Sequence, residues 1–395
     1  MGIHNLNQIL QKYAPNCYQT IHLSEFSEKK IAIDISLYFY KYKSSSGERW
    51  IENFLGMIQC LRKWNIHPVF IYEGKAPQEK FIEQERRRHS RDKQEEKIHL
   101  LERQIVDYEK NGVIGDLLGE ICYVDYVKIP SLFRKEKKDE GDKDKKDNKK
   151  FNLQLAKDKV GILKNGVVHV TEEDVHRSKQ LFDILSIPYL QAPFEAECFA
   201  SHLCVYGFVD AVLSEDTDVI VYQTPLSISK LDTINNTVVQ INYGKMIEEL
   251  GFTSNMFTDM CIMCSCDYNA NIPLIGPEKS YSLIKDHRSI DHIFDVLRSI
   301  KQKDGRPKYD EADFSKLNHV RCRELFTTSR EQIDMVDLPC LYTGEPNFTQ
   351  LEEFCRKNNV RYTLDRLVKC MKCMEVDFIE EEKKEDTNEE VPTDT

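Results

Sequence analysis

The fold is decided by two short apolar runs, Lys30-Ile-Ala-Ile-Asp34 and His67-Pro-Val-Phe-Ile-Tyr-Glu73. Each run has the length and the β-branched or aromatic content of a buried strand, and each ends on a carboxylate. Between them, residues 50–64 show the apolar spacing of a helix. This alternation predicts an α/β fold with a mixed, largely parallel twisted sheet flanked by helices.

The same patterns continue along the chain. Short apolar runs predict two further strands, at residues 210–214 and 219–222. Helical spacing and turn signals predict helices at residues 78–110, 174–187, 195–206 and 254–264, one after Gly276-Pro277, and helical chain to about residue 374.

Two segments have the composition of disordered chain. Residues 134–150 contain fifteen charged residues and no apolar one. Residues 375–395 contain ten acidic residues and two lysines. Neither segment has the apolar surface that a folded core requires, so both are expected to be disordered.

The cysteines and the N-terminus indicate the compartment. Thirteen cysteines is an odd number, and residues 1–10 lack the apolar run of a signal peptide. With no apolar stretch of about 18 residues, no membrane span is expected. We therefore predict an intracellular protein with reduced thiols. Cys261, Cys264, Cys266 and the Cys370–Cys373 pair are interpreted as buried structural thiols, because a structural zinc needs four ligands.

Seven carboxylates stand where parallel strands and the following turns would bring them to one edge of the sheet. They are Asp34, Glu73, Glu195, Glu197, Asp216, Asp218 and Asp267. Clustered carboxylates repel one another, and hard divalent cations such as Mg²⁺ relieve that repulsion. Any one of them could equally be a turn residue or a helix cap, so spacing alone leads only to a candidate metal-dependent α/β enzyme.

Several motifs together resemble the flap endonuclease/XPG superfamily of structure-specific 5′ nucleases. The resemblance covers about residues 1–100 and 170–300, in the family's order, and implies a PIN-like nuclease core with a helical arch and a helix–two-turn–helix element. The matching motifs are Met1-Gly2-Ile3, Ile31-Ala-Ile-Asp34-Ile-Ser36, Pro68-Val-Phe-Ile-Tyr-Glu73-Gly74-Lys75, Ile187-Pro-Tyr-Leu-Gln-Ala-Pro-Phe-Glu195-Ala-Glu197, Ser214-Glu-Asp216-Thr-Asp218, Cys266-Asp267-Tyr268 and Ile275-Gly276-Pro277.

The resemblance implies a role for each candidate residue. Two Mg²⁺ ions, with Mn²⁺ as a substitute, would be held by two ligand sets. The first set is Asp34, Glu73, Glu195 and Glu197, and the second is Asp216, Asp218 and Asp267. Lys80 and Arg87 would be catalytic and would stabilise negative charge on the phosphate. Gly2, Tyr40, Gly276 and Lys279 would contact DNA, with Tyr40 stacking on a base and K⁺ bound at the helix–two-turn–helix.

The resemblance also divides the chain. The parts are 1–98 (nuclease core with the basic arch helix), 99–170 (arch and insert), 171–300 (nuclease core with the helix–two-turn–helix), 301–374 (a helical region) and 375–395 (an acidic tail). Branched or flapped DNA would be the partner of a monomer, in the nucleus or, for a virus, the host nucleus or replication compartment. The sliding-clamp motif common in the family is absent from the sequence.

Four departures from the family affect these expectations. Glu73 stands where the family carries Asp, which lengthens one ligand, and Mg²⁺ tolerates altered geometry poorly. Leu274 replaces a glycine of the family's Gly-Ile-Gly turn, and Glu278 replaces a basic residue. The segment between Glu73 and Glu195 is about fifty residues longer than in a compact flap endonuclease.

The net charge of −11 argues, taken alone, against a DNA-binding protein. Residues 375–395 contribute −8, so the rest of the chain carries −3 and would be close to neutral with two divalent ions bound.

The function expected from the family resemblance is 5′-flap cleavage with 5′–3′ exonuclease activity in replication or repair. The alternatives are a bubble- or junction-cutting relative, a DNA-structure-binding module without catalysis, and a metal phosphatase acting on small molecules.

Overall fold

The computed structural model describes residues 2–125, 149–309 and 311–370. The chain divides into two compact units. The core unit comprises residues 1–42, 48–83 and 170 onward, and the insert unit comprises residues 43–47 and 84–169. Most of the segment 134–150 and all of 375–395 lie outside the described residues, so their predicted disorder stays a prediction.

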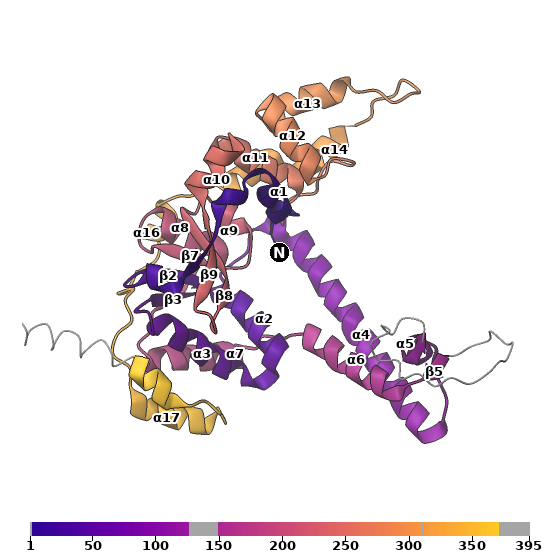
Figure 1. Cartoon of the computed structure of the whole chain (residues 1–395). Helices are drawn as coiled ribbons and strands as arrows, with labels where there is room; N and C mark the ends of the chain where they lie inside the picture. The colour runs from indigo at the N-terminus through magenta and orange to yellow at the C-terminus, as the bar shows by residue number, and fades with distance from the viewer. Residues whose placement is uncertain (1, 126–148, 310, 371–395) are drawn as a thin grey trace, which may run out of the picture. The chain divides into compact units, whose positions relative to one another are not determined.

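The core unit is built on a seven-stranded sheet in the order β1-β9-β8-β7-β2-β3-β6 (Figure 1). The strands are β1 (Tyr18–His22), β2 (Lys30–Asp34), β3 (His67–Tyr72), β6 (Tyr189–Gln191), β7 (Ala211–Leu213), β8 (Leu226–Asp232) and β9 (Thr237–Asn242). From β8 to β6 the neighbouring strands run parallel, while β9 is antiparallel to both β8 and β1. The predicted mixed, largely parallel sheet is confirmed.

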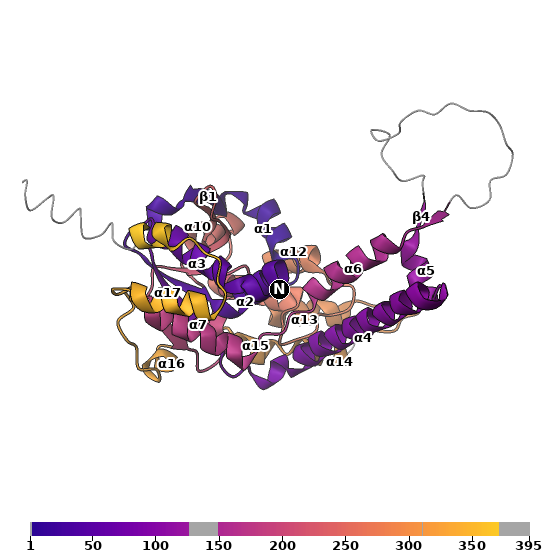
Figure 2. The same cartoon turned by 90° about the horizontal axis from the view of Figure 1, so that it is seen from below.

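Helices cover both faces of this sheet (Figures 1 and 2). The α-helices of the core unit are α1 (Leu6–Tyr13), α2 (Ile35–Ser46), α3 (Trp50–Arg62), α7 (Glu172–Ile184), α8 (Ala196–Val205), α9 (Asp218–Val221), α10 (Tyr243–Leu250), α11 (Ser254–Cys264), α12 (Pro277–His287), α13 (Ile290–Ser299), α14 (Glu311–Leu317), α15 (His319–Leu325), α16 (Glu331–Asp334) and α17 (Phe348–Lys357). Short 3₁₀ helices are η1 (Pro15–Cys17), η2 (Leu23–Phe26), η3 (Gly47–Arg49) and η4 (Gln78–Lys80).

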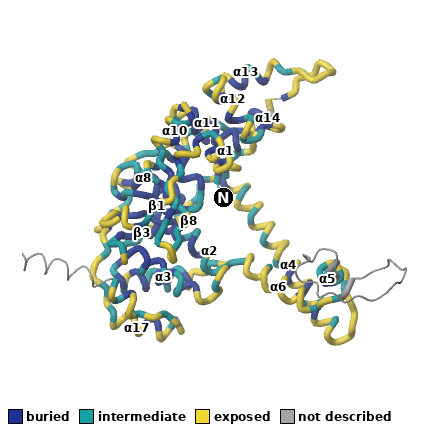
Figure 3. The backbone as a smooth tube through the Cα atoms, in the orientation of Figure 1, coloured by how far each residue is buried: buried dark blue, intermediate teal, exposed yellow. Residues whose placement is uncertain are grey.

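Alternation along the central strands produces two separate hydrophobic cores. Ile31 and Ile33 of β2 pack with α2, α3, α7 and α17, whereas Ala32 faces α1, α8 and α11. Figure 3 shows the buried chain concentrated in the strands and in the helices against them. Burial on both faces explains why these strands are continuous apolar runs in the sequence.

The insert unit has a small core of its own. Its elements are α4 (Phe81–Asn111, which starts in the core unit), α5 (Asp116–Cys122), β4 (Tyr123–Asp125), β5 (Lys149–Phe151) and α6 (Leu153–Gly166). Leu101, Leu118 and Ala156 are fully buried within it. Ion pairs join α6 to α4, among them Lys164 with Glu102 at 2.6 Å. Within the described residues, no helix of either unit combines the length and the apolar character needed to cross a bilayer.

Three local predictions are wrong. Residues 219–222, predicted as a strand, belong to α9 and the turn after it, because a four-residue apolar run fits a buried helical turn equally well. Lys149 and Lys150, expected in the disordered loop, begin β5, which pairs with β4. Cys370 is only partly buried, whereas Cys261, Cys264 and Cys266 are buried and free as predicted. Cys373 lies outside the described residues.

Candidate metal centre

Four parallel strands bring the predicted carboxylates to one edge of the sheet. Strands β7, β2, β3 and β6 lie side by side, so their carboxyl ends coincide. Asp34 is the last residue of β2, and Glu73 directly follows β3. Glu195 precedes α8 after β6, and Asp216 lies in the turn between β7 and α9.

A close approach of two backbones sets the spacing between Glu73 and Glu195. The Gly74 N–H donates to the carbonyl of Phe194 at 2.9 Å. A Cβ atom on Gly74 would lie 2.1 Å from the carbonyl oxygen of Ala192. Only glycine therefore allows the chain leaving β3 to run against the chain leaving β6.

Three carboxylates form the centre of the cluster. Glu197, Asp216 and Asp218 each offer an oxygen atom, and these atoms lie within 4.8 Å of one another. Asp218 is 1% exposed, and its Oδ1 has no hydrogen-bond partner among the described residues. A buried carboxylate oxygen that accepts no hydrogen bond destabilises the fold unless a cation binds to it. This donor set therefore fits hard divalent cations that prefer oxygen ligands.

Lys80 supplies positive charge to the remaining carboxylates. Its ammonium group contacts Glu195, lies 3.3 Å from Glu197 Oε1 and lies 3.4 Å from Asp267 Oδ2. Burial opposes the charge on Lys80, but the carboxylates of Glu197 and Glu195 outweigh it and raise the lysine pKa above its ordinary value. One ammonium group cannot neutralise seven carboxylates, so the centre is short of positive charge.

The pKa shifts agree with this shortage of positive charge. Burial, reinforced by the charges of Glu197 and Asp216, raises the pKa of Asp34 to about 8. Burial and the neighbouring Asp216 also raise the pKa of Asp218 well above its ordinary value. Glu73 is the most exposed of the seven carboxylates, and its Oε2 accepts from the Ala196 N–H at 3.4 Å.

Two tyrosines behind the cluster were not recognised from the sequence. The Tyr268 hydroxyl donates to Glu195 Oε2, and the Tyr222 and Tyr268 hydroxyls lie 2.8 Å apart. Both tyrosines are almost fully buried. Tyr268 follows Asp267 in the sequence, but adjacency to one carboxylate does not reveal a contact with another that lies 73 residues away.

Gly2 lies directly against the carboxylates. Its φ is +81°, and a Cβ atom there would lie 2.1 Å from Asp216 Oδ1 and 2.6 Å from Asp218 Oδ1. The family resemblance implies that a small residue is needed here to leave room for DNA. The structure gives a second reason, because any side chain at Gly2 would collide with the carboxylates themselves.

Replacing Gly2 by alanine is therefore expected to weaken Mn²⁺ binding about tenfold, because the chain or the carboxylates must shift. Isothermal titration calorimetry measures this affinity. Gly56→Ala on α3 is the matched control, since nothing lies within 4 Å of a Cβ atom at Gly56. Equal Mn²⁺ affinities for the two variants would show that Gly2 does not constrain the cluster.

The other predicted residues lie elsewhere. Tyr40 is exposed on α2, where its ring is accessible. Arg87 lies on α4 in the insert unit. Gly276 precedes α12, and Lys279 on α12 donates to the Tyr309 hydroxyl at 3.1 Å. The roles predicted for these four residues remain proposals.

Two departures from the family, Leu274 and Glu278, lie at an exposed turn and at a helix–helix contact. Leu274 is 79% exposed and keeps the left-handed conformation that glycine favours, with φ +65°. Glu278 accepts hydrogen bonds from Lys12 at 2.8 Å and Tyr13 at 2.7 Å. Its carboxylate therefore joins α12 to α1.

Metal binding is expected to strengthen as the pH rises from 6 to 8. Asp34 stays protonated in the metal-free fold up to about pH 8, whereas in the unfolded chain it ionises near pH 4. The folded state thus holds more protons than the unfolded state in this range, and its stability falls with increasing pH. A bound cation displaces the proton from Asp34 and compensates for this loss of folding stability.

Thermal unfolding at pH 6 and pH 8.5, with EDTA or with Mn²⁺, tests this expectation. The metal-induced rise in melting temperature should be larger at pH 8.5, and Asp34→Asn should reduce the difference. A rise of the same size at both pH values would contradict it.

Comparisons with known proteins agree with this geometry. Residues 1–94 match the XPG N-terminal domain, and residues 186–267 match the XPG I-region. The chain is 30% identical to a probable RAD2-like endonuclease, 369L, of Invertebrate iridescent virus 6, over 92% of this chain and 90% of that protein. It is 27% identical to flap endonuclease 1 of Tetrahymena thermophila, over 82% and 76% of the two chains.

Solved structures share the fold. The catalytic core of Rad2 in complex with DNA substrate superposes with a TM-score of 0.61 at 16% identity, covering 93% of this chain and all of that one. Flap endonuclease-1 from Methanococcus jannaschii gives a TM-score of 0.54 at 19% identity, with coverages of 90% and 94%.

Proposed function

The chain belongs to the flap endonuclease/XPG superfamily, and from this membership we propose that it is a divalent-metal-dependent, structure-specific DNA endonuclease. We propose 5′ flaps as its main substrate, with 5′–3′ exonuclease activity, in replication or repair. The observation that carries the proposal is the cluster of Glu197, Asp216 and Asp218, with Lys80 bound to the carboxylates beside it.

The residues of the cluster and those around it would have separate roles in cleavage. The seven carboxylates would hold two Mg²⁺ ions, in the two ligand sets expected from the sequence. Bound ions would supply Lewis acidity that activates water and stabilises the leaving oxygen. Lys80 already lies among the carboxylates and would stabilise negative charge on the phosphate, assisted by Arg87. Tyr268 would hold Glu195 in one orientation.

DNA binding would use residues outside the cluster. Tyr40 is exposed and would stack on an unpaired base. Gly276 and Lys279, at the start of α12, would contact duplex phosphates, with K⁺ bound in the preceding turn. We further propose a monomer acting in the nucleus or in a viral replication compartment.

A panel of labelled DNA substrates tests this function. Wild-type protein and Asp216→Asn are incubated in Mg²⁺ with 5′-flap, nicked, bubble and four-way-junction DNA. We expect the wild type to cut the flap fastest and the variant to cut nothing. Faster cutting of the bubble or the junction would show that this structure, and not the 5′ flap, is the main substrate. Cleavage by Asp216→Asn would contradict the proposed catalytic site. An absence of cleavage would favour a DNA-binding module, although all seven carboxylates and Lys80 argue against that alternative.

A further inference from the structure

We propose that a segment of the C-terminal helical region, Lys316–Phe326, is a positioning element for the metal centre. This segment, called the buttress here, comprises the end of α14, α15 and the residue after it. It contacts Asn269 in the loop that carries Asp267, Glu79 beside Lys80, and Tyr268, which binds Glu195. The proposal rests on the function proposed above and assigns a role to a region outside all the family motifs in the sequence.

The buttress holds the loop that carries Asp267. The Ala270 N–H donates to the carbonyl of Lys316 at 3.2 Å. The Asn269 side chain donates to the carbonyls of Leu317 at 3.0 Å and Ile262 at 2.9 Å, and it accepts from the Cys266 N–H at 2.9 Å. Asn269 therefore ties this loop both to α11 and to the buttress.

The buttress also reaches the turn that carries Lys80. Arg321 Nε donates to Glu79 Oε1 at 2.8 Å, and Glu79 is the residue directly before Lys80 in η4. Arg321 Nη1 also donates to Glu324 at 2.9 Å, which fixes the guanidinium on α15. An exposed ion pair adds little to stability, but this one connects η4 directly to α15.

A third contact lies behind Glu195. The ring of Phe326 packs against the rings of Tyr222 and Tyr268, each with a centroid distance of 5.4 Å. Tyr268 in turn donates its hydroxyl to Glu195. Phe326 is 1% exposed, so it limits how far Tyr268 can retreat from the carboxylate.

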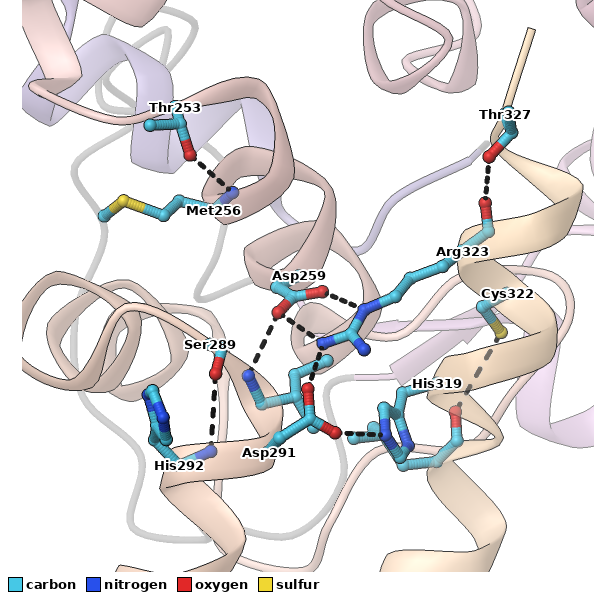
Figure 4. A network of polar contacts seen from close by, with 12 residues as sticks. Thr253, Met256, Asp259, Ser289, Asp291, His292, His319, Cys322, Arg323 and Thr327 are labelled. Atoms are coloured by element: carbon cyan, nitrogen blue, oxygen red, sulfur yellow. Dashed lines mark hydrogen bonds and ion pairs between the residues drawn. The ribbon is translucent and has the colours of Figure 1, made fainter.

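The buttress itself is fixed by a network of charges around a buried carboxylate, shown in Figure 4. Arg323 donates two hydrogen bonds of 2.7 Å to Asp259 on α11 and one of 2.9 Å to Asp291 on α13. Asp259 also accepts from the Ile290 N–H at the start of α13, and His319 lies 3.1 Å from Asp291. A bidentate pair on a buried carboxylate holds α15 in one orientation.

The three contacts converge on neighbouring groups, since Lys80 touches both Glu195 and Asp267. A small displacement of the buttress would therefore move the ammonium and two carboxylates relative to one another. Such displacements lower the catalytic rate more than substrate affinity, because DNA binding uses a much larger surface.

Charge reversal at the exposed contact gives the first test. Arg321→Glu is expected to lower kcat about tenfold with little change in KM, and adding Glu79→Arg is expected to restore most of the rate. Arg330→Glu is the matched control, because Arg330 forms an exposed ion pair with Asp334 and contacts no support of the site among the described residues. A kcat for Arg321→Glu equal to that of the control, or no rescue by the charge swap, would overturn the proposal.

Hydrogen exchange gives a second test that needs neither metal nor cleavage. In Arg323→Lys, which loses the bidentate pair but keeps the charge, the peptide covering residues 265–270 should exchange about tenfold faster than in wild type. Unchanged exchange there would overturn the buttress. If the wild type cleaves no DNA, the proposed function fails, and this exchange still decides whether the buttress supports the loop.

Discussion

Replacing Asp218 by asparagine is expected to lower the rate of DNA cleavage about a thousandfold and to stabilise the metal-free protein. The introduced amide would keep the shape of the side chain but lose the charge that binds the cation. The same change removes a buried carboxylate whose pKa is raised by burial and by Asp216. Without metal, burying an ionisable carboxylate here only destabilises the fold, so its replacement should add about 1–2 kcal/mol.

Single-turnover cleavage and thermal unfolding in EDTA measure the two effects. Asp337→Asn, at an exposed position after α16, is the control and should change neither. If Asp218→Asn destabilises the metal-free protein, the carboxylate has a structural role, and repulsion within the cluster is not its main energetic feature.

Replacing Lys80 by methionine is expected to reduce the rate of cleavage by about two to three orders of magnitude. Unlike Asp218→Asn, it should destabilise the metal-free protein. Lys80 is the cation that Glu195, Glu197 and Asp267 share. Its loss leaves buried carboxylates without a counter-charge, which should cost about 3 kcal/mol in the metal-free protein near pH 8. Added Mn²⁺ should recover part of this stability, because it supplies positive charge to the same groups.

Chemical denaturation with and without Mn²⁺ tests this second expectation. Lys12→Met removes an exposed ion pair with Glu278 and should cost much less stability than Lys80→Met. Equal losses for the two lysines would mean that Lys80 is not the counter-ion of the cluster. Together, Asp218→Asn and Lys80→Met predict opposite changes in stability but a similar loss of activity.

Much of the sheet can be predicted from the sequence, because its central strands are buried on both faces. Strands β2 and β3 are continuous apolar runs that match the predicted bounds closely. The strands β1, β6, β8 and β9 were not predicted, because β6 has only three residues and because polar residues interrupt the apolar ones in β1, β8 and β9, so that none forms a continuous apolar run. The four-residue run at 219–222 fits either a strand or a helix, and only its burial beside α8 decides for the helix.

The carboxylates of the site can also be predicted from the sequence, but the contacts that hold them cannot. Carboxylates that follow parallel strands must share an edge of the sheet, so the cluster of Asp34, Asp216 and Asp218 follows from topology. The contacts that hold the cluster join residues far apart in the chain. Arg321 lies 242 residues from Glu79, and Tyr268 lies 73 residues from Glu195. No local pattern in the sequence encodes such pairs.

The central claim is that the carboxylate cluster binds divalent cations, and anomalous diffraction from crystals grown with Mn²⁺ tests it most directly. We predict two anomalous peaks among the seven carboxylates, with Glu197, Asp216 and Asp218 within coordination distance, and their loss in Asp218→Asn crystals. An absence of peaks at the cluster in Mn²⁺-containing crystals, or peaks only at other sites, would contradict the account.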